Sequence, residues 1–208
     1  MLLKKVRHLL EVKRICPLHG PVLDEDIDYY LDLYDTWSSY GTETEGIAVF
    51  YTSVYGNTKR AAEKLADALK ANGCPKVALN DLAREDMAEC VEDAFRYGRI
   101  VLATTTYNAE IFPFMRTFIE ELTERNFSNR TVGFIENGSW APQAEKVMKK
   151  MLEGCKNLTF AENTVHIKSA LNDESNAQIQ ALADELCRDY LAQKDDTADK
   201  NDLTALFK

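Results

Sequence analysis

Short apolar segments alternate with segments of helical periodicity five times along this chain, and this alternation constrains the fold more than any other feature. The predicted strands span residues 47–51, 77–80, 100–104, 132–135 and 164–167. The predicted helices that follow them span residues 59–72, 85–97, 114–126, 143–154 and 176–193. Short strands rich in Val, Ile and Leu are typical of a sheet covered on both faces. The pattern therefore predicts an α/β fold with a doubly wound, five-stranded parallel sheet.

The first 44 residues do not follow this repeat and predict an N-terminal helical appendage. Residues 2–12 and 27–37 have helical patterns, and the Pro and Gly residues of the segment 16–21 predict a rigid turn between them. The Gly-containing segment 41–46 predicts a linker. We therefore expect an appendage with its linker over residues 1–44, one domain over 45–193 and a polar C-terminal tail over 194–208.

Composition excludes several classes of partner. The chain has 208 residues and a formal net charge of −9, which argues against nucleic acid or an anionic membrane surface as the main partner. It contains no apolar run long enough to span a bilayer. The five cysteines are scattered, odd in number and never spaced as C-x-x-C, so we expect reduced, structural thiols in a cytoplasmic protein.

The loop after the first predicted strand has the chemistry of a phosphate site. A hydroxyl-rich turn with a glycine, placed between a strand and a helix, gathers backbone N–H groups at the positive end of the helix dipole. The loop has no Lys or Arg, so neutral donors would have to hold the anion. The candidate residues are Ser53, Val54, Tyr55, Gly56, Asn57 and Thr58.

Two further loops follow the third and fourth predicted strands. The first, 104–113, carries three threonine hydroxyls, an aromatic ring and an amide, and the second, 136–142, places a tryptophan beside a glycine. Because the carboxyl ends of parallel strands meet at one edge of a sheet, we expect all three loops to form one site. Tyr107 and Trp140 could stack on a planar ring, whose faces need apolar cover.

Other phosphate ligands fit less well. A triphosphate with Mg²⁺ usually needs G-x-x-x-x-G-K-S/T, and a dinucleotide needs G-x-G-x-x-G; both motifs are absent after the first strand. A receiver domain needs acidic residues where Thr52 and Ser53 stand. Any one loop could equally be an ordinary turn with satisfied hydroxyls, but three such loops at one edge favour a phosphate monoester on a flavin.

The loop 53–58 resembles the phosphate loop of flavodoxin-like proteins. Together, the three loops resemble the FMN-binding domain of A-type flavoproteins, the flavodiiron proteins, over about residues 15–190. This resemblance implies FMN as the cofactor and a flavodoxin-like sheet with strand order 2-1-3-4-5. It also implies that the residues of 53–58 hold the phosphate. The residues expected to line the flavin ring are Thr105, Thr106, Tyr107, Asn108 and Ala109, with Asn137, Gly138, Ser139 and Trp140 at the other edge.

The start of the chain resembles the end of the metallo-β-lactamase-like domain that precedes the flavodoxin domain in flavodiiron proteins. By this resemblance His19, in an H-G-P turn, corresponds to a metal ligand. The chain has only three histidines, His8, His19 and His166, which are too few for a diiron site. We therefore expect no metal site and no oxygen or nitric oxide reductase activity from this chain alone, and a structural role for His166.

Without a neighbouring domain, the N-terminal helices would expose apolar faces, and such patches usually find a partner. We expect self-association, giving a homo-oligomer, or docking to a separate β-lactamase-like subunit; a strictly monomeric state would count against this. The residues concerned are Leu2, Leu3, Leu9, Leu10, Ile27, Tyr30 and Trp37.

The resulting hypothesis is an FMN-binding electron-transfer flavoprotein that receives electrons from a rubredoxin-like or reductase donor. Glu110 and Glu136 would lower the flavin potential if they point inward, and are solvated surface acids otherwise. The alternatives are an FMN-dependent NAD(P)H:acceptor reductase and a docking module that has lost its flavin. Reduction of bound FMN by NADH or NADPH alone would favour the reductase.

Overall fold

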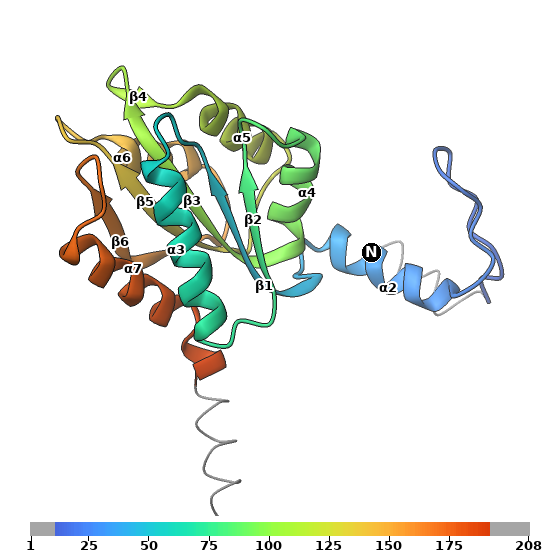
Figure 1. Ribbon diagram of the computed structural model, residues 1–208. Coiled ribbons are helices and arrows are strands. Elements are labelled where there is room, and N and C mark those ends of the chain that lie inside the picture. Colours follow the sequence, from blue (N-terminus) through green and yellow to red (C-terminus); the bar gives the residue numbers. More distant parts are fainter. Residues whose placement is uncertain (1–10, 192–208) are drawn as a thin grey trace, which may run out of the picture.

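A parallel sheet forms the centre of the computed structural model, which describes residues 11–191 (Figure 1). Its long strands are arranged in the order β2-β1-β3-β5-β6, and a two-residue strand, β4 (Glu110–Ile111), pairs antiparallel with β3. Counting only the five long strands, this order is 2-1-3-4-5, so the predicted fold is confirmed. The long strands are β1 (Thr44–Tyr51), β2 (Val77–Asp81), β3 (Tyr97–Tyr107), β5 (Thr131–Asn137) and β6 (Thr159–Ile167).

Helices cover both faces of the sheet (Figure 1). In β1, Ile47 and Val49 belong to the apolar cluster that includes α3 and α7, whereas Ala48 and Phe50 belong to the cluster that includes α4, α5 and α6. All four side chains are fully buried. The two-sided cover explains why the strands are apolar runs rather than alternating sequences. The helices are α3 (Asn57–Ala71), α7 (Asp173–Leu186), α4 (Met87–Arg96), α5 (Pro113–Glu124) and α6 (Ala144–Leu152).

The element boundaries differ from the predicted ones where side chains or strand pairing decide them. Helix α7 starts three residues before the predicted position because Asn172 and Ser175 form a capping box: the Asn172 side chain accepts from Ser175 N, and the Ser175 hydroxyl accepts from Asn172 N. Strand β1 starts at Thr44, so part of the predicted linker belongs to the sheet. The predicted end of the last helix, at residue 193, lies outside the described residues.

Strand β4 and its hairpin were not predicted. Tyr107 pairs with Glu110 across a two-residue loop, Asn108 and Ala109, whose φ angles are 52° and 59°. Two consecutive positive φ values are the signature of a type I′ turn, which matches the twist of paired strands. The usual sequence signal is Asn-Gly, and alanine in the second position conceals it.

The N-terminal segment contains the predicted turn and the second predicted helix. Ile15 and Leu23 exchange two backbone hydrogen bonds of 2.8 and 3.0 Å and close the turn that contains His19. Helix α2 (Ile27–Ser38) matches the predicted range 27–37 and extends away from the sheet (Figure 1). Most of the predicted helix 2–12, including Leu2, Leu3, Leu9 and Leu10, lies outside the described residues, as does the predicted tail 194–208.

A buried arginine attaches the segment after α2 to the domain. The guanidinium of Arg130 donates to the carbonyl oxygens of Tyr40 at 2.7 Å and Gly41 at 3.0 Å, and also to Phe95 O. Burial lowers the pKa of Arg130. Together with the carbonyl oxygens of Ser128 and Asn129, five acceptors stabilise a cation that is 3% exposed, and the chain enters β1 from a defined position.

The structure shows how far the five cysteines are buried. Cys74, Cys90 and Cys187 are buried, Cys155 is partly buried and Cys16 is exposed. Burial, aided by nearby carboxylates, raises the pKa of the Cys90 thiol to about 11, so this thiol stays protonated and unreactive at neutral pH. Within residues 11–191, no helix is long and apolar enough to cross a membrane.

We predict that Gly46→Ala destabilises the domain. Gly46 has a φ of 153°, and a Cβ atom there would lie 2.4 Å from the carbonyl oxygen of Lys76. This oxygen belongs to the backbone directly before β2 and accepts a hydrogen bond from Ile47 N, so it cannot move freely. We expect the free energy of unfolding to fall by about 1–3 kcal/mol in urea denaturation. The matched control is Gly154→Ala, because a Cβ atom at Gly154 would meet no atom within 4 Å. Equal losses in the two variants would contradict this explanation.

Candidate functional site

A polar cavity of about 310 Å³ lies where β1, β3 and β5 end. All three predicted loops contribute to it, as expected for the carboxyl edge of a parallel sheet. From β1 the chain continues to β2 on one side of the sheet, and from β3 it continues to β5 on the other side. The neighbouring strands β1 and β3 therefore mark the switch point of the strand order. The lining residues are Ser53, Val54, Tyr55, Asn57, Thr58, Thr105, Thr106, Asn137, Gly138, Ser139, Trp140 and Ser169.

The first turn of α3 offers free backbone donors to this cavity. Gly56, which precedes the helix, has a φ of 83°, a left-handed conformation that favours glycine, and no side chain caps the helix. The N–H groups of the first helical turn have no partners within a helix, and the helix dipole adds positive potential there. An anion is therefore the natural ligand for this end of the cavity.

A second donor in the same loop also lacks a partner. Among the buried side-chain nitrogen and oxygen atoms of residues 11–191, only Ser53 Oγ and Arg130 Nε have no hydrogen-bond partner. Burying a hydroxyl without a partner costs free energy, so such a group in a native structure needs an explanation. Because Ser53 lines the cavity, a ligand that accepts its hydroxyl hydrogen would supply the missing partner.

The other hydroxyls of the loops hold the cavity together. Thr52 and Thr104 are fully buried, and their hydroxyl oxygens are 2.6 Å apart, which joins the residue after β1 to β3. The hydroxyl of Thr105 donates to Asn137 O at 3.0 Å. Thr106 Oγ1 accepts from Gln143 N at 2.9 Å and from Ala144 N at 3.2 Å, and so caps the start of α6. These side chains fix the positions of the loops relative to one another.

Asn137 is bonded within the protein rather than left free for a ligand. Its Nδ2 donates to Thr58 Oγ1 at 3.3 Å and to Ser169 O at 3.1 Å, and its Oδ1 accepts from Ser169 N at 3.1 Å. The amide hydrogens are therefore both used, and Asn137 positions α3 and the loop after β6. Ser169 was not among the predicted residues, although it follows the last strand at the same edge of the sheet.

Exposed aromatic side chains stand at the cavity. Tyr55 and Trp140 are 88% and 90% exposed and both belong to its lining. Tyr107 is half exposed and packs edge-on against Phe112 with ring centroids 5.4 Å apart. Tyr107, Asn108 and Ala109 form the hairpin rim outside the lining, and Gly56 lies between two lining residues without belonging to it. Their contacts with a ligand stay predictions.

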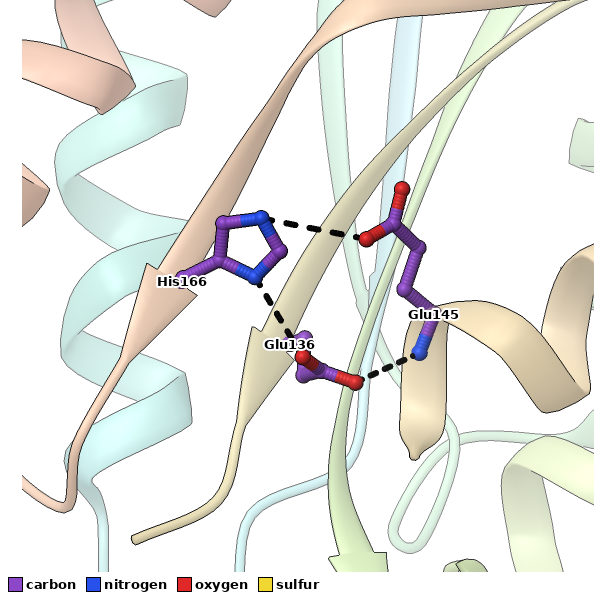
Figure 2. A group of neighbouring side chains, drawn as sticks. All are labelled: Glu136, Glu145 and His166. Carbon is purple, nitrogen blue, oxygen red and sulfur yellow. Dashed lines mark hydrogen bonds and ion pairs between the residues drawn. The ribbon is translucent and has the colours of Figure 1, made fainter. Parts of the chain in front are cut away.

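Glu110 and Glu136, which would lower the flavin potential if they pointed inward, do not line the cavity. Glu110 is exposed and forms an ion pair with Arg116. Glu136 is buried, so its alternative interpretation as a solvated surface acid is wrong. Its Oε2 accepts from the backbone N–H of Glu145 at 2.9 Å, and its Oε1 faces His166 (Figure 2).

The Glu145 carboxyl beside them is held in its ionised form. Partial burial would raise its pKa, but hydrogen bonds from Lys149 and Thr164 outweigh this and lower the pKa overall. The distances are 2.6 Å from Lys149 Nζ and 2.9 Å from Thr164 Oγ1. Glu136 and Glu145 therefore belong to a charged, hydrogen-bonded network outside the cavity lining.

Comparison with known proteins gives a family match over most of the domain. A family model described as a flavodoxin domain matches residues 48–178. Anaerobic nitric oxide reductase flavorubredoxins of Escherichia coli and Shigella flexneri are 25% and 26% identical to this chain over 183 residues. Each match covers 87% of this chain and 36% of the relative, so the chain spans about a third of the length of the curated relatives it matches.

Solved structures share the fold. The rubredoxin oxygen:oxidoreductase of Desulfovibrio gigas has a TM-score of 0.79 at 20% identity and covers 91% of this chain and 48% of its own. The flavodiiron protein of Giardia intestinalis also has a TM-score of 0.79 at 20% identity, with 92% and 49% covered. A flavodoxin from the domain Archaea has a TM-score of 0.59 at 17% identity, with 69% and 97% covered. At these identities the likeness concerns the fold alone.

We predict that Ser53→Ala does not destabilise the ligand-free protein. The substitution removes a buried hydroxyl without a partner, so the free energy of unfolding should stay unchanged or rise by about 1 kcal/mol. Chemical denaturation of ligand-free protein measures this directly. Thr52→Ala provides the contrast, because it leaves Thr104 without its partner and should cost about 1–3 kcal/mol. A loss in Ser53→Ala as large as in Thr52→Ala would mean that the Ser53 hydroxyl is bonded in solution.

Proposed function

The chain belongs to the flavodoxin domain family, so its cofactor is FMN, and we propose that it is an electron-transfer flavoprotein. In this proposal FMN binds in the cavity at the ends of β1, β3 and β5. The observation that carries this placement is the Ser53 hydroxyl, buried without a partner beside the uncapped start of α3. A phosphate monoester can accept hydrogen bonds from both. The residue types present therefore suit the phosphate end of FMN.

In this proposal the phosphate is held without a cationic side chain. The lining contains no Lys or Arg, so the backbone N–H groups and the α3 dipole supply the positive potential. Thr58 Oγ1 accepts a hydrogen bond from Asn137 and keeps its own hydrogen to donate to the phosphate. The residues assigned to the phosphate are Ser53, Val54, Tyr55, Gly56, Asn57 and Thr58.

The flavin ring is assigned to the aromatic side of the cavity. Tyr55 and Trp140 expose ring faces that can stack on a planar heterocycle and shield it from water. When bound, FMN supplies the electron-transfer chemistry, and the protein sets its position and surroundings. The other residues assigned to the ring and its edges are Thr105, Thr106, Tyr107, Asn108, Ala109, Asn137, Gly138 and Ser139, of which Asn137 acts by positioning.

The electron donor is proposed to be a rubredoxin-like protein or a reductase. Support comes from the names of the relatives, a flavorubredoxin and a rubredoxin oxygen:oxidoreductase, which associate this fold with rubredoxin. Association with a second copy or with a β-lactamase-like subunit also stays a proposal. It is supported by exposed aromatic side chains on α2, namely Tyr29, Tyr34 and Trp37.

We predict that Ser53→Ala weakens FMN binding by about 10- to 100-fold, because a hydrogen bond to a charged group contributes about 1.5–3 kcal/mol. Quenching of flavin fluorescence during titration with ligand-free protein measures the dissociation constant. Riboflavin, which lacks the phosphate, should bind both proteins equally well. Ser38→Ala, an exposed serine on α2, is the matched control and should change neither affinity. If Ser53→Ala weakens riboflavin as much as FMN, the phosphate lies elsewhere.

We also predict that NADH or NADPH alone reduces the bound FMN slowly, whereas a reduced rubredoxin-like protein or a reductase with NADH reduces it fast. Anaerobic stopped-flow absorption of the flavin band distinguishes the two cases. Rapid bleaching by NADH without any protein donor would replace the electron-carrier assignment by that of an NAD(P)H:acceptor reductase. Protein that stays colourless and does not quench added FMN would contradict both.

A further inference from the structure

Three ionisable side chains that do not line the cavity converge between β5, β6 and the start of α6 (Figure 2). Glu136 of β5 and His166 of β6 are direct partners in the register of these two strands, and Glu145 lies in the first turn of α6. One possible ligand atom from each residue lies within 4.8 Å of the other two. Backbone pairing and a helix start therefore hold one imidazole and two carboxylates together.

Each carboxylate is fixed through one oxygen and presents the other to the histidine. Glu136 Oε2 accepts from Glu145 N, and Glu145 Oε1 accepts from Lys149 Nζ and Thr164 Oγ1. The remaining oxygens face the ring: Glu136 Oε1 is 3.3 Å from Nδ1, and Glu145 Oε2 is 3.8 Å from Nε2. Hydrogen bonds to the second oxygen are the arrangement that orients carboxylate ligands at metal sites.

The two carboxylates face different nitrogens of the ring, since Glu136 lies beside Nδ1 and Glu145 beside Nε2. An imidazole with a single N–H can donate to only one of them. A divalent cation on Nδ1 would be shared with Glu136 Oε1, and Glu145, which offers a ligand atom within 4.8 Å, would reach the same cation by a rotation of its side chain.

We propose that Glu136, Glu145 and His166 form a binding site for a divalent transition-metal cation of the Zn²⁺ type. Two ligands at about 2.0–2.2 Å from a tetrahedral Zn²⁺ are about 3.4 Å apart, close to the separation of His166 Nδ1 and Glu136 Oε1. Imidazole with carboxylates favours Zn²⁺ over Ca²⁺ or Mg²⁺, which prefer oxygen ligands alone. The His166 side chain is half exposed, so the cation can enter and keep a water ligand.

A cation at this position would join β5, β6 and α6 and so stabilise the folded domain. The site stands apart from the proposed flavin function, because none of its three side chains lines the cavity. Failure of one proposal therefore leaves the other intact.

The test is calorimetric titration of the full chain with ZnCl₂ at neutral pH, together with thermal unfolding with and without Zn²⁺. We expect the wild-type protein to bind one Zn²⁺ at this site and to unfold at a higher temperature with the metal. His166→Gln and Glu145→Gln should each weaken binding by about 10-fold or more and abolish the thermal shift. Glu145→Gln keeps the backbone N–H that Glu136 accepts, so the α6 start should stay in place.

The exposed Cys16 and His19 are the competing ligands in the described N-terminal segment, and the double variant Cys16→Ser/His19→Gln is the matched control. It should retain the Zn²⁺ affinity and the thermal shift. X-ray absorption of the zinc complex should show only N and O ligands, without the Zn–S distance of about 2.3 Å. The proposal is overturned by absence of Zn²⁺ binding, by unchanged binding in both His166→Gln and Glu145→Gln, or by loss of binding in the control variant.

Discussion

The parallel register of β1, β3 and β5 is the constraint on which the site depends. Tyr51, Ala103 and Ile135 lie side by side in this register, so the loop after β1 starts beside the last residues of β3 and β5. The buried contact between the hydroxyls of Thr52 and Thr104 joins the start of this loop to β3. A hydrogen bond in dry surroundings is costly to break, because both hydroxyls would then lack partners. The three loops therefore meet in a defined geometry before any ligand arrives.

Within this frame, the pattern of satisfied and unsatisfied groups indicates the ligand. The hydroxyls of Thr105 and Thr106 and the amide of Asn137 are bonded to neighbouring loops, whereas Ser53 Oγ and the first turn of α3 are not. The open donors gather at one end of the cavity, and the exposed aromatic rings of its lining offer stacking faces. A neutral set of donors suits a phosphate monoester better than a triphosphate, whose larger charge usually needs Lys and a metal ion.

The end of β5 serves two sites because successive strand residues point to opposite faces. Asn137 faces the cavity and bonds to Thr58, while its neighbour Glu136 faces α6 and His166. This alternation explains why a carboxylate next to a cavity residue has no place in the lining. It also places a polar network, and the proposed metal site, on the other face of β5, outside the cavity lining. Thr106 of β3 and Glu136 of β5 both accept hydrogen bonds from backbone N–H groups at the start of α6. This helix start is therefore held by two neighbouring strands.

The sequence by itself determined the alternation of the long strands with helices and the three loops at the sheet edge, because apolar periodicity is a local property. The strand order of the sheet followed from the family resemblance that the three loops carry. The sequence did not reveal β4, since Asn108-Ala109 lacks the usual glycine, or the place of Ser169 in the lining. Only the tertiary structure decided that Asn137 is used within the protein, that Glu136 turns away from the cavity and that Ser53 lacks a partner. Those outcomes depend on which side chains meet across 30 to more than 70 residues of sequence, as Asn137 meets Ser169 and Thr58. No local pattern encodes such meetings, because strand register and helix packing bring the partners together.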